Sequence, residues 1–219
     1  MKKILAIALG TIILFFVSCK KDTGPAKQNA SSPSPTQSTS YLPMKVGNYW
    51  VYEYYTMDSL SVETDQHHLD SLYIDKDSVV GGRTFYHYAT QSTNSMFTNM
   101  SVAGKWLTDS SAFVYSLGHS VTYLDPVHLN DTIRTDSMVW GYVFYEVPVA
   151  FSNDITPSGT YSGIGTDVWI RRENPAHNFP HPSSYNNFAQ GTGIIQFKCA
   201  FASDPMGGYL WKLARYHLN

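Results

Sequence analysis

The sequence predicts an all-β protein with minor helix, built as one large, curved antiparallel sheet in the form of a half-barrel or a sandwich. Apolar and aromatic residues recur at every second position in several segments, which is the period of a strand. No segment keeps a 3.6-residue period with capping residues over several turns, so helices should be few and short. The 16 Tyr, 11 Phe and 5 Trp point the same way, because bulky rings pack well on pleated sheets.

The first strand is predicted within residues 47–55. Trp50, Tyr52 and Tyr54 occupy alternate positions there and make a continuous aromatic face, whereas Glu53 lies on the opposite face. This alternation is typical of a strand whose two faces meet different surroundings.

A β-hairpin is predicted around Gly81-Gly82, because both glycines tolerate positive φ and extended runs at 72–80 and 83–88 flank them. Pro148, near the end of another extended run, indicates a sheet edge or a strand terminus. Further strands are expected at 112–117, 120–124, 139–149, 166–171, 193–201 and 208–218.

Turns are predicted at Asp125-Pro126, Asn174-Pro175 and Asp204-Pro205, which are turn-forming pairs. Residues 159–163, Gly-Thr-Tyr-Ser-Gly, lack the spacing of a strained serine elbow and are also interpreted as a turn. No catalytic residue is assigned from the sequence.

The start of the chain has the form of a secretory signal. Lys2 and Lys3 precede an apolar run without a charge at residues 4–17. Because a spanning helix needs about 20 apolar residues, this run is too short for a stable anchor. Residues 1–18 are therefore predicted to be a signal peptide.

The junction Phe16-Val17-Ser18-Cys19 resembles the lipobox of bacterial lipoproteins. In that family the cysteine sulfur receives a diacylglyceryl group, the peptide is cut before it, and the new amine is acylated. The resemblance implies that Cys19 is the lipid attachment site, and two or three acyl chains such as palmitate suffice for stable attachment. The run Ser18–Asp22 resembles Bacteroidota lipoproteins in particular, which implies the outer membrane, on the periplasmic face or the cell surface.

Residues 19–40 are predicted to be the lipidated cysteine and a disordered linker. Beyond Cys19 this stretch has no bulky apolar residue and is rich in Ser, Pro and Thr, so it cannot bury enough surface to offset its ordering entropy. Residues 41–219 are then expected to form a single β-rich domain. The stretches 41–52 and 189–197 are similar to Bacteroidota lipoproteins of unknown role, which implies a β-sheet domain and no catalytic assignment.

Charge and motifs exclude several function classes. The formal charge is −2, and it becomes −4 when residues 1–18 are removed, so no basic field holds nucleic acid and the lipid must hold the membrane. Gly163-Ile164-Gly165 lacks the third glycine of a dinucleotide-binding loop. No cofactor is expected.

His177 and His181 are the candidate metal ligands. Imidazoles four residues apart share one face of a helix, as metal sites often require, but Pro180 and Pro182 oppose a helix there. His67-His68 could add ligands, although adjacent residues of a strand point to opposite faces. Solvated loop histidines are the favoured interpretation.

Cys199 shares its parity with Ile195 and Phe197 in the strand predicted at 193–201, which predicts a core position for a small hydrophobe. A reactive thiol would instead require an exposed, electropositive setting.

An Asp-Ser/Thr-apolar pattern occurs five times, more often than composition alone predicts. It resembles the O-glycosylation motif of exported Bacteroidota proteins, which implies sugars on five hydroxyls: Ser59, Ser71, Ser78, Thr132 and Ser137. The alternative is turn chemistry, because Asp and Ser bond to nearby backbone before a strand begins. Both interpretations stay open.

The favoured function is a lipid-anchored cell-envelope lipoprotein whose domain is a non-enzymatic binding or structural module for a protein, glycan or apolar ligand. The surplus rings could stack on sugars or enclose an acyl chain, but packing on strands is the favoured explanation. The alternative function is an envelope hydrolase or a metal-dependent enzyme that uses the His177–His181 loop.

Overall fold

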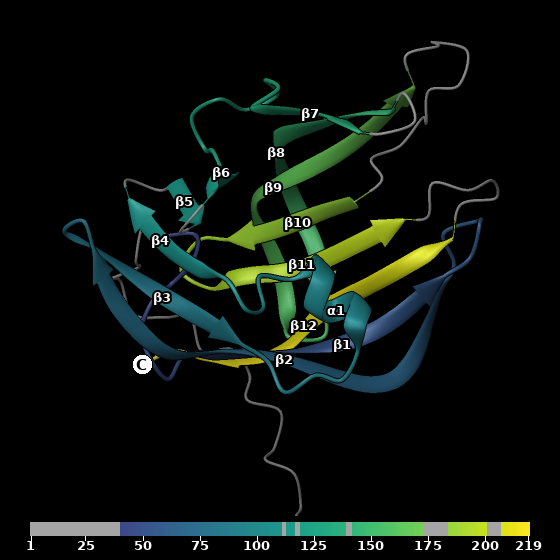
Figure 1. Ribbon diagram of the computed structural model, residues 1–219. Coiled ribbons are helices and arrows are strands. Elements are labelled where there is room, and N and C mark those ends of the chain that lie inside the picture. Colours follow the sequence, from purple (N-terminus) through teal and green to yellow (C-terminus); the bar gives the residue numbers. More distant parts are fainter. Residues whose placement is uncertain (1–39, 111–112, 117–118, 139–141, 173–183, 201–206) are drawn as a thin grey trace, which may run out of the picture. The chain divides into compact units, whose positions relative to one another are not determined.

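The computed structural model describes residues 40–110, 113–116, 119–138, 142–172, 184–200 and 207–219 (Figure 1). In these ranges the protein is nearly all-β, with twelve strands in one sheet and one short helix. Each strand is antiparallel to its neighbours. The predicted fold class is confirmed.

The elements follow one another as β1 (Tyr49–Met57), β2 (Glu63–Val80), β3 (Arg83–Ala89), α1 (Ser95–Met100), β4 (Trp106–Ser110), β5 (Phe113–Ser116), β6 (His119–Leu124), β7 (Arg134–Met138), β8 (Tyr142–Thr156), β9 (Gly159–Arg172), β10 (Ser184–Ala189), β11 (Gly193–Ala200) and β12 (Gly208–His217). Their order across the sheet is β6-β5-β4-β3-β2-β1-β12-β11-β10-β9-β8-β7. The first and last strands therefore pair near the middle, and β6 and β7 form the two edges.

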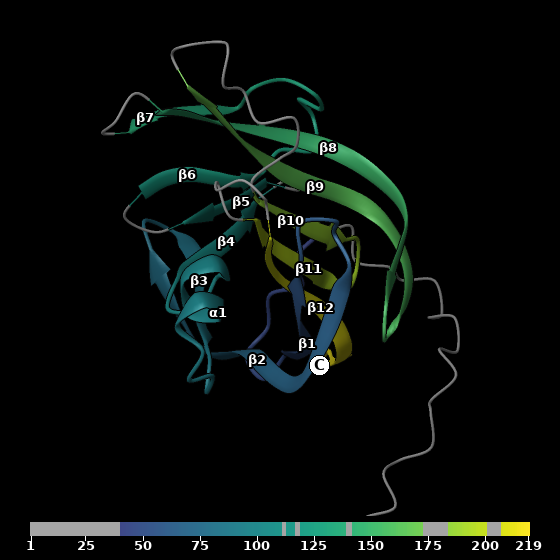
Figure 2. The same cartoon turned by 90° about the vertical axis from the view of Figure 1, so that its right-hand side faces the viewer.

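The sheet curls into a half-barrel around α1. In Figure 2 the helix lies between β3–β6 on one side and β10–β12 on the other. We call the side that faces α1 the inner face and the opposite side of β10–β12 the outer face. Phe97 of α1 meets Phe197 of β11 and Trp211 of β12, with ring centroids 5.9 and 5.7 Å apart.

The aromatic alternation predicted for the first strand is confirmed. Trp50 and Tyr52 are buried to 1% and 0% exposure, and Tyr54 is half-buried beside Trp211. The Trp50 indole donates to the Thr192 carbonyl at 2.7 Å, and the Tyr52 hydroxyl donates to the Ile194 carbonyl at 2.9 Å. Burial of these rings is accompanied by hydrogen bonds for their polar atoms, as a packed interior requires.

The predicted hairpin around Gly81-Gly82 is confirmed as the β2–β3 connection, in which Val80 pairs with Arg83. Gly81 and Gly82 have φ values of +59° and +77°, a backbone conformation that residues with a side chain disfavour.

Pro148 lies at a sheet edge, as predicted, but it does not end its strand. β8 continues to Thr156, while β7 pairs with β8 only as far as Glu146. At Pro148 one side of β8 therefore pairs with β9, and the other side has no strand neighbour among the described residues, although the Pro148 carbonyl accepts a hydrogen bond from the Asn130 backbone. A missing N–H is tolerated at such a position.

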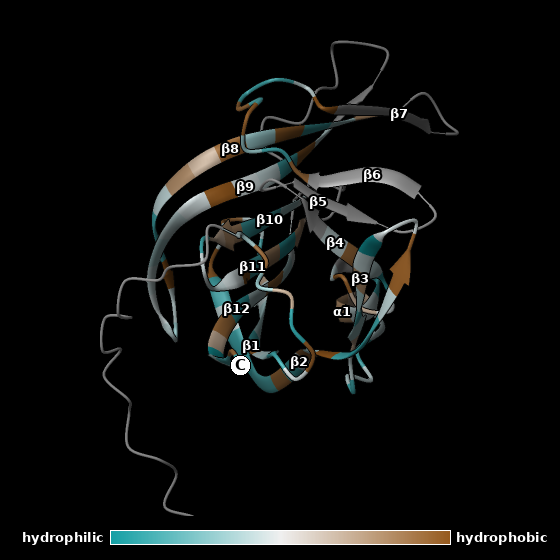
Figure 3. Cartoon of the chain, turned by 90° about the vertical axis from the view of Figure 1, so that its left-hand side faces the viewer, coloured by the Kyte–Doolittle hydropathy of each residue, from teal (hydrophilic) through white to brown (hydrophobic). Residues whose placement is uncertain are grey.

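The long β8–β9 hairpin bends over the outer face of β10–β12 (Figures 1 and 2). Its tip reaches β12, because the Ser158 backbone N–H donates to the Leu213 carbonyl at 3.0 Å. A register shift between Phe151 and Asp154 accommodates the bend. Hydrophobic and hydrophilic residues are interspersed along both strands (Figure 3), and their described side chains range from buried to exposed.

The turn predicted at residues 159–163 is wrong. These residues begin β9, and Gly163 lies so close to β10 that a Cβ atom there would collide with the Phe188 carbonyl. Gly163 therefore allows close strand contact rather than chain reversal. β4, β7 and β10 were not predicted, whereas the strands expected at 112–117, 120–124, 193–201 and 208–218 coincide with β5, β6, β11 and β12.

Candidate functional site

Several residues singled out from the sequence lie outside the described residues. They are Cys19, His177 and His181, together with the turns at Asn174-Pro175 and Asp204-Pro205. Among the residues that the structure describes, no three His, Cys, Asp or Glu side chains are grouped to hold a metal ion. No helix in the described part is long and apolar enough to cross a membrane.

The Asp-Ser/Thr motifs have different surroundings. Ser59 lies within a turn in which the Asp58 carboxylate accepts backbone N–H groups from Leu60 and Val62, both at 2.9 Å. That geometry is the turn chemistry expected as the alternative to glycosylation. Ser78 and Thr132 are exposed, and Ser137 lies in β7. Glycosylation of the five hydroxyls stays a prediction.

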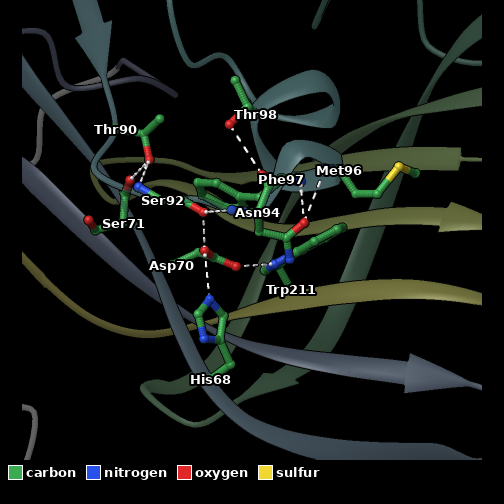
Figure 4. Close-up of polar contacts among 10 residues, drawn as sticks. All are labelled: His68, Asp70, Ser71, Thr90, Ser92, Asn94, Met96, Phe97, Thr98 and Trp211. Carbon is green, nitrogen blue, oxygen red and sulfur yellow. Dashed lines mark hydrogen bonds and ion pairs between the residues drawn. The ribbon is translucent and has the colours of Figure 1, made fainter.

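The motif at Asp70-Ser71 belongs to a buried polar network instead (Figure 4). Asp70 is 1% exposed. Its Oδ2 accepts the Trp211 indole N–H at 2.8 Å, and its Oδ1 accepts the Ser92 hydroxyl and lies 3.2 Å from His68 Nε2. The carboxylate is therefore satisfied by three partners within the protein.

This network fixes the start of α1. The Ser92 hydroxyl accepts the Asn94 backbone N–H at 2.9 Å, and Asn94 caps the helix by accepting from Met96 and Phe97 at 3.0 and 3.3 Å. Six residues cannot form a stable helix alone, so the cap and the burial of Phe97 hold it. Asp70 bonds directly to both Ser92 and His68, whereas in a catalytic triad the histidine itself bonds to the serine. The network is structural.

A second group of polar side chains lies on the outer face of β10 and β11 and continues onto the neighbouring strand β9. In the strand register, Tyr185 of β10 is opposite Asp167 of β9 on one side and opposite Lys198 of β11 on the other. Opposite residues of paired strands project to the same face, so these three side chains form one row across three strands. We call them the outer-face row.

The outer-face row is electrostatically unusual. Burial raises the pKa of Asp167 to about 6, although the nearby Lys198 ammonium opposes this shift. Burial also lowers the pKa of Lys198, against the opposing effect of Glu63 and Asp167. The Tyr185 pKa is raised by burial and by Asp154, Glu63 and Asp167. Each group is thus partly desolvated in its charged form.

The Lys198 ammonium lies over the Tyr185 ring, 5.4 Å from its centroid, which is the distance of a cation–π contact. Asp167, by contrast, accepts no hydrogen bond and joins no ion pair with any residue in the described ranges. It is the least satisfied carboxylate of this face.

A neighbouring pair of amides borders the row. Asn187 is opposite Gln196 in the β10–β11 register, and its side chain donates to Asp154 at 2.6 Å. Oriented to suit its neighbours, the Gln196 amide donates to both Asp154 oxygens, at 3.0 and 2.6 Å, and accepts from the Tyr185 hydroxyl at 3.3 Å. Asp154, which the bent β8 supplies, thereby fixes the amides and the phenol beside Asp167.

A salt bridge continues the polar surface toward β1. The Lys212 ammonium contacts Glu63 at 2.6 Å and lies 5.4 Å from the centroid of the Tyr55 ring. The Tyr55 hydroxyl donates to Glu53 at 2.7 Å, and burial together with Glu53 raises its pKa. These side chains satisfy one another.

Cys199 is half-buried near the end of β11 and lies outside the core cluster, so the predicted core position is only partly right. Burial raises the pKa of its thiol, which does not favour a reactive thiolate.

The sequence alone did not predict the outer-face row. Asp167 and Lys198 were each visible as a charged residue inside a predicted strand, which is a signal of a functional or paired position. Their juxtaposition required β10, which carries Tyr185 and was not predicted, and the register of three strands. Neither can be obtained from one sequence.

No family model matches the sequence, and no curated protein matches it. Among solved structures, the chain is similar to a protein from Parabacteroides distasonis described as a lipoprotein, with a TM-score of 0.40, 12% identity and coverage of 82% of this chain and 99% of that chain. It is also similar to a protein from Bacteroides fragilis described as exported and as having a YmcC-like fold, with a TM-score of 0.43, 11% identity and coverage of 80% of this chain and 98% of that chain.

Proposed function

We propose that the protein is a lipid-anchored cell-envelope protein of the outer membrane, whose β domain is a non-enzymatic binding module. Cys19 carries the lipid, and residues 20–40 are the linker between the lipid and the domain. The sequence supports this proposal through Lys2, Lys3, the apolar run 4–17 and the cysteine that follows it directly.

The contrast between the two faces of β10–β12 carries the binding role. The inner face is occupied by α1 and by rings that touch one another, such as Tyr52 and Phe197 with centroids 5.0 Å apart. An apolar ligand there would have to displace the helix. The outer face instead holds Asp167 without a hydrogen-bonding partner among the described residues, beside the half-buried Tyr185 and Lys198.

A glycan is the ligand class that this contrast favours among proteins, glycans and apolar molecules. Its hydroxyls both donate and accept hydrogen bonds, which the polar outer face can use. A purely apolar ligand would leave the same groups desolvated without partners.

Lipid attachment is tested by metabolic labelling with a palmitate analogue in the native host. The chain has two cysteines, so Cys199→Ser is a matched control for Cys19→Ser. We expect label and membrane association in the wild type and in Cys199→Ser, and loss of both in Cys19→Ser. Label retained by Cys19→Ser would contradict the proposed anchor.

A further inference from the structure

We propose that the outer-face row of Asp167, Tyr185 and Lys198 is a binding site for a neutral carbohydrate. The inference deepens the proposed function, on which it rests, by assigning the residues and the charge class of the ligand. Adjacent strands lie about 4.8 Å apart, so the three side chains present a carboxyl, an aromatic ring and an ammonium as close neighbours.

The carboxylates of the protein differ in how well they are satisfied. Asp70 has three polar partners, and Asp154 accepts from the amides of Asn187 and Gln196. Asp125 accepts from the Val127 backbone at 3.0 Å and lies 2.7 Å from the His128 ring nitrogen. Asp167 has no such partner within the described ranges. A half-buried carboxylate without a donor among the described residues is free to accept donors from a ligand, and its two oxygens can accept two neighbouring hydroxyls.

The charge balance of the row selects a neutral ligand. Asp167 and Lys198 carry opposite charges, and both are partly desolvated. A ligand with a net charge would match one of them and repel the other, leaving a partly buried charge uncompensated. A neutral carbohydrate supplies hydroxyl donors to Asp167 and oxygen acceptors to Lys198 at once.

Tyr185 gives the site its apolar element. A sugar presents C–H groups as well as hydroxyls, and a tyrosine ring offers contact area with little loss of conformational freedom. The Tyr185 hydroxyl is held by Gln196, which Asp154 orients in turn. The ring is therefore positioned before a ligand arrives, which reduces the entropic cost of binding.

The surroundings of Asp167 favour a binding role over a structural one. Its burial raises the pKa, so the ionised form opposes folding at neutral pH instead of supporting it. A structural carboxylate such as Asp70 is bonded within the fold. A group that destabilises the free protein and that a ligand can satisfy is typical of a functional site.

The test uses the full-length protein purified in detergent from its own host. Binding to an array of neutral, sialylated and sulfated glycans identifies the charge class of the ligand. Binding of the zwitterion glycylglycine is measured separately by calorimetry. Calorimetry with the best neutral glycan then compares the wild type with Asp167→Asn and Lys198→Met. Exposed Asp77 and Lys76 on β2 provide the controls Asp77→Asn and Lys76→Met, and Lys76 also lies near an aromatic ring, 5.7 Å from the Trp106 centroid.

We expect a neutral glycan to bind, with at least tenfold weaker affinity in Asp167→Asn and Lys198→Met and unchanged affinity in both controls. Asp167→Asn should unfold at the same temperature as the wild type or at a higher one. Weaker affinity in this variant would then reflect lost ligand contacts and not misfolding. Equal affinity in Asp167→Asn would overturn the site but leave a glycan-binding module. Preference for charged glycans or glycylglycine, or binding of no neutral glycan, would overturn the ligand class. Loss of the lipid anchor would be seen separately, by labelling.

Discussion

Asp70 and Asp167 are carboxylates with opposite surroundings. Asp70 is buried and bonded to Trp211, Ser92 and His68, so its charge is compensated inside the fold. Asp167 is half-buried and bonded to none of the described residues. The first should contribute to stability, and the second should reduce it at neutral pH.

Substituting Asp70 tests whether this carboxylate contributes to stability. Asn in its place keeps the shape but removes the charge and one acceptor, so Trp211 or Ser92 loses a charge-assisted hydrogen bond worth about 1.5–3 kcal/mol. We expect Asp70→Asn to lower the free energy of unfolding by about that amount in urea denaturation. Asp77→Asn, at an exposed position, should change it by about 0.5 kcal/mol or less. Equal effects of the two substitutions would contradict a structural role for the network.

The pH dependence of stability tests whether Asp167 destabilises the fold at neutral pH. The folded pKa of Asp167 is about 6, above the ordinary value of 3.8 that applies to the unfolded chain. Between these values the folded state binds more protons, so the contribution of Asp167 to stability falls as pH rises and stays low above about pH 6.

We therefore expect Asp167→Asn to stabilise the protein at pH 7.5 by about 1 kcal/mol, after allowance for screening of a partly exposed group. The gain should disappear near pH 4. Thermal or urea unfolding at the two pH values measures it, and a destabilised variant at pH 7.5 would show that Asp167 is paired in the fold.

Single residues could be interpreted from the sequence only where a local pattern determines their surroundings. The alternation of Trp50 and Tyr52 predicted their shared face, because strand geometry alone fixes it. The role of Asp70 depends on Ser92 and Trp211, which lie 22 and 141 positions away in the chain. No local pattern contains that information.

α1 depends on the sheet around it. Its six residues gain their stability from the Asn94 cap and from Phe97, which is fully buried among Tyr52, Phe197 and Trp211. The sequence offered no helical period over so short a segment, and the helix was therefore not located, although few and short helices were expected.

Removing the Phe97 ring should detach α1. We expect Phe97→Ala to lower the free energy of unfolding by about 3–5 kcal/mol and to increase amide exchange in α1 before the rest of the sheet. Thr98→Ala, at an exposed position of the same helix, should have a small effect. If Phe97→Ala does not fold, Phe97→Leu provides a milder test, and unchanged exchange in that variant would show that the ring does not hold the helix.

The contact between β9 and β10 depends on the absence of a side chain at Gly163. A methyl group there would collide with the Phe188 carbonyl, which is backbone and cannot move aside alone. We expect Gly163→Ala to lower the unfolding midpoint and to increase exchange along β9–β10, whereas Ser162→Ala, exposed next to it, should not. Full retention of exchange protection in Gly163→Ala would contradict the close strand contact.

The bend of β8–β9 could not be obtained from the sequence. A strand was predicted at residues 139–149, but β8 runs on to Thr156 and the hairpin then bends over part of the outer face, with its tip at β12. A bulge between Phe151 and Asp154 and a glycine at 163 permit this path, and neither has a distinctive local signal.

For the domain as a whole, the sequence predicted the class and most strands but not their order. Periodicity identifies strands because it reports which residues share a face. The pairing of β1 with β12 joins residues more than 150 positions apart, and the row of Asp167, Tyr185 and Lys198 exists only because β9, β10 and β11 are neighbours. Long-range pairing is therefore where a single sequence ceases to be informative.

The mass of the intact protein, extracted with detergent from the envelope of its host, tests the central claim of lipid attachment. We expect a chain that begins at Cys19 and carries two or three acyl chains, with any further mass in units of sugar reporting on Ser59, Ser71, Ser78, Thr132 and Ser137. A chain that still begins at Met1, or a Cys19 thiol without lipid, would contradict the account.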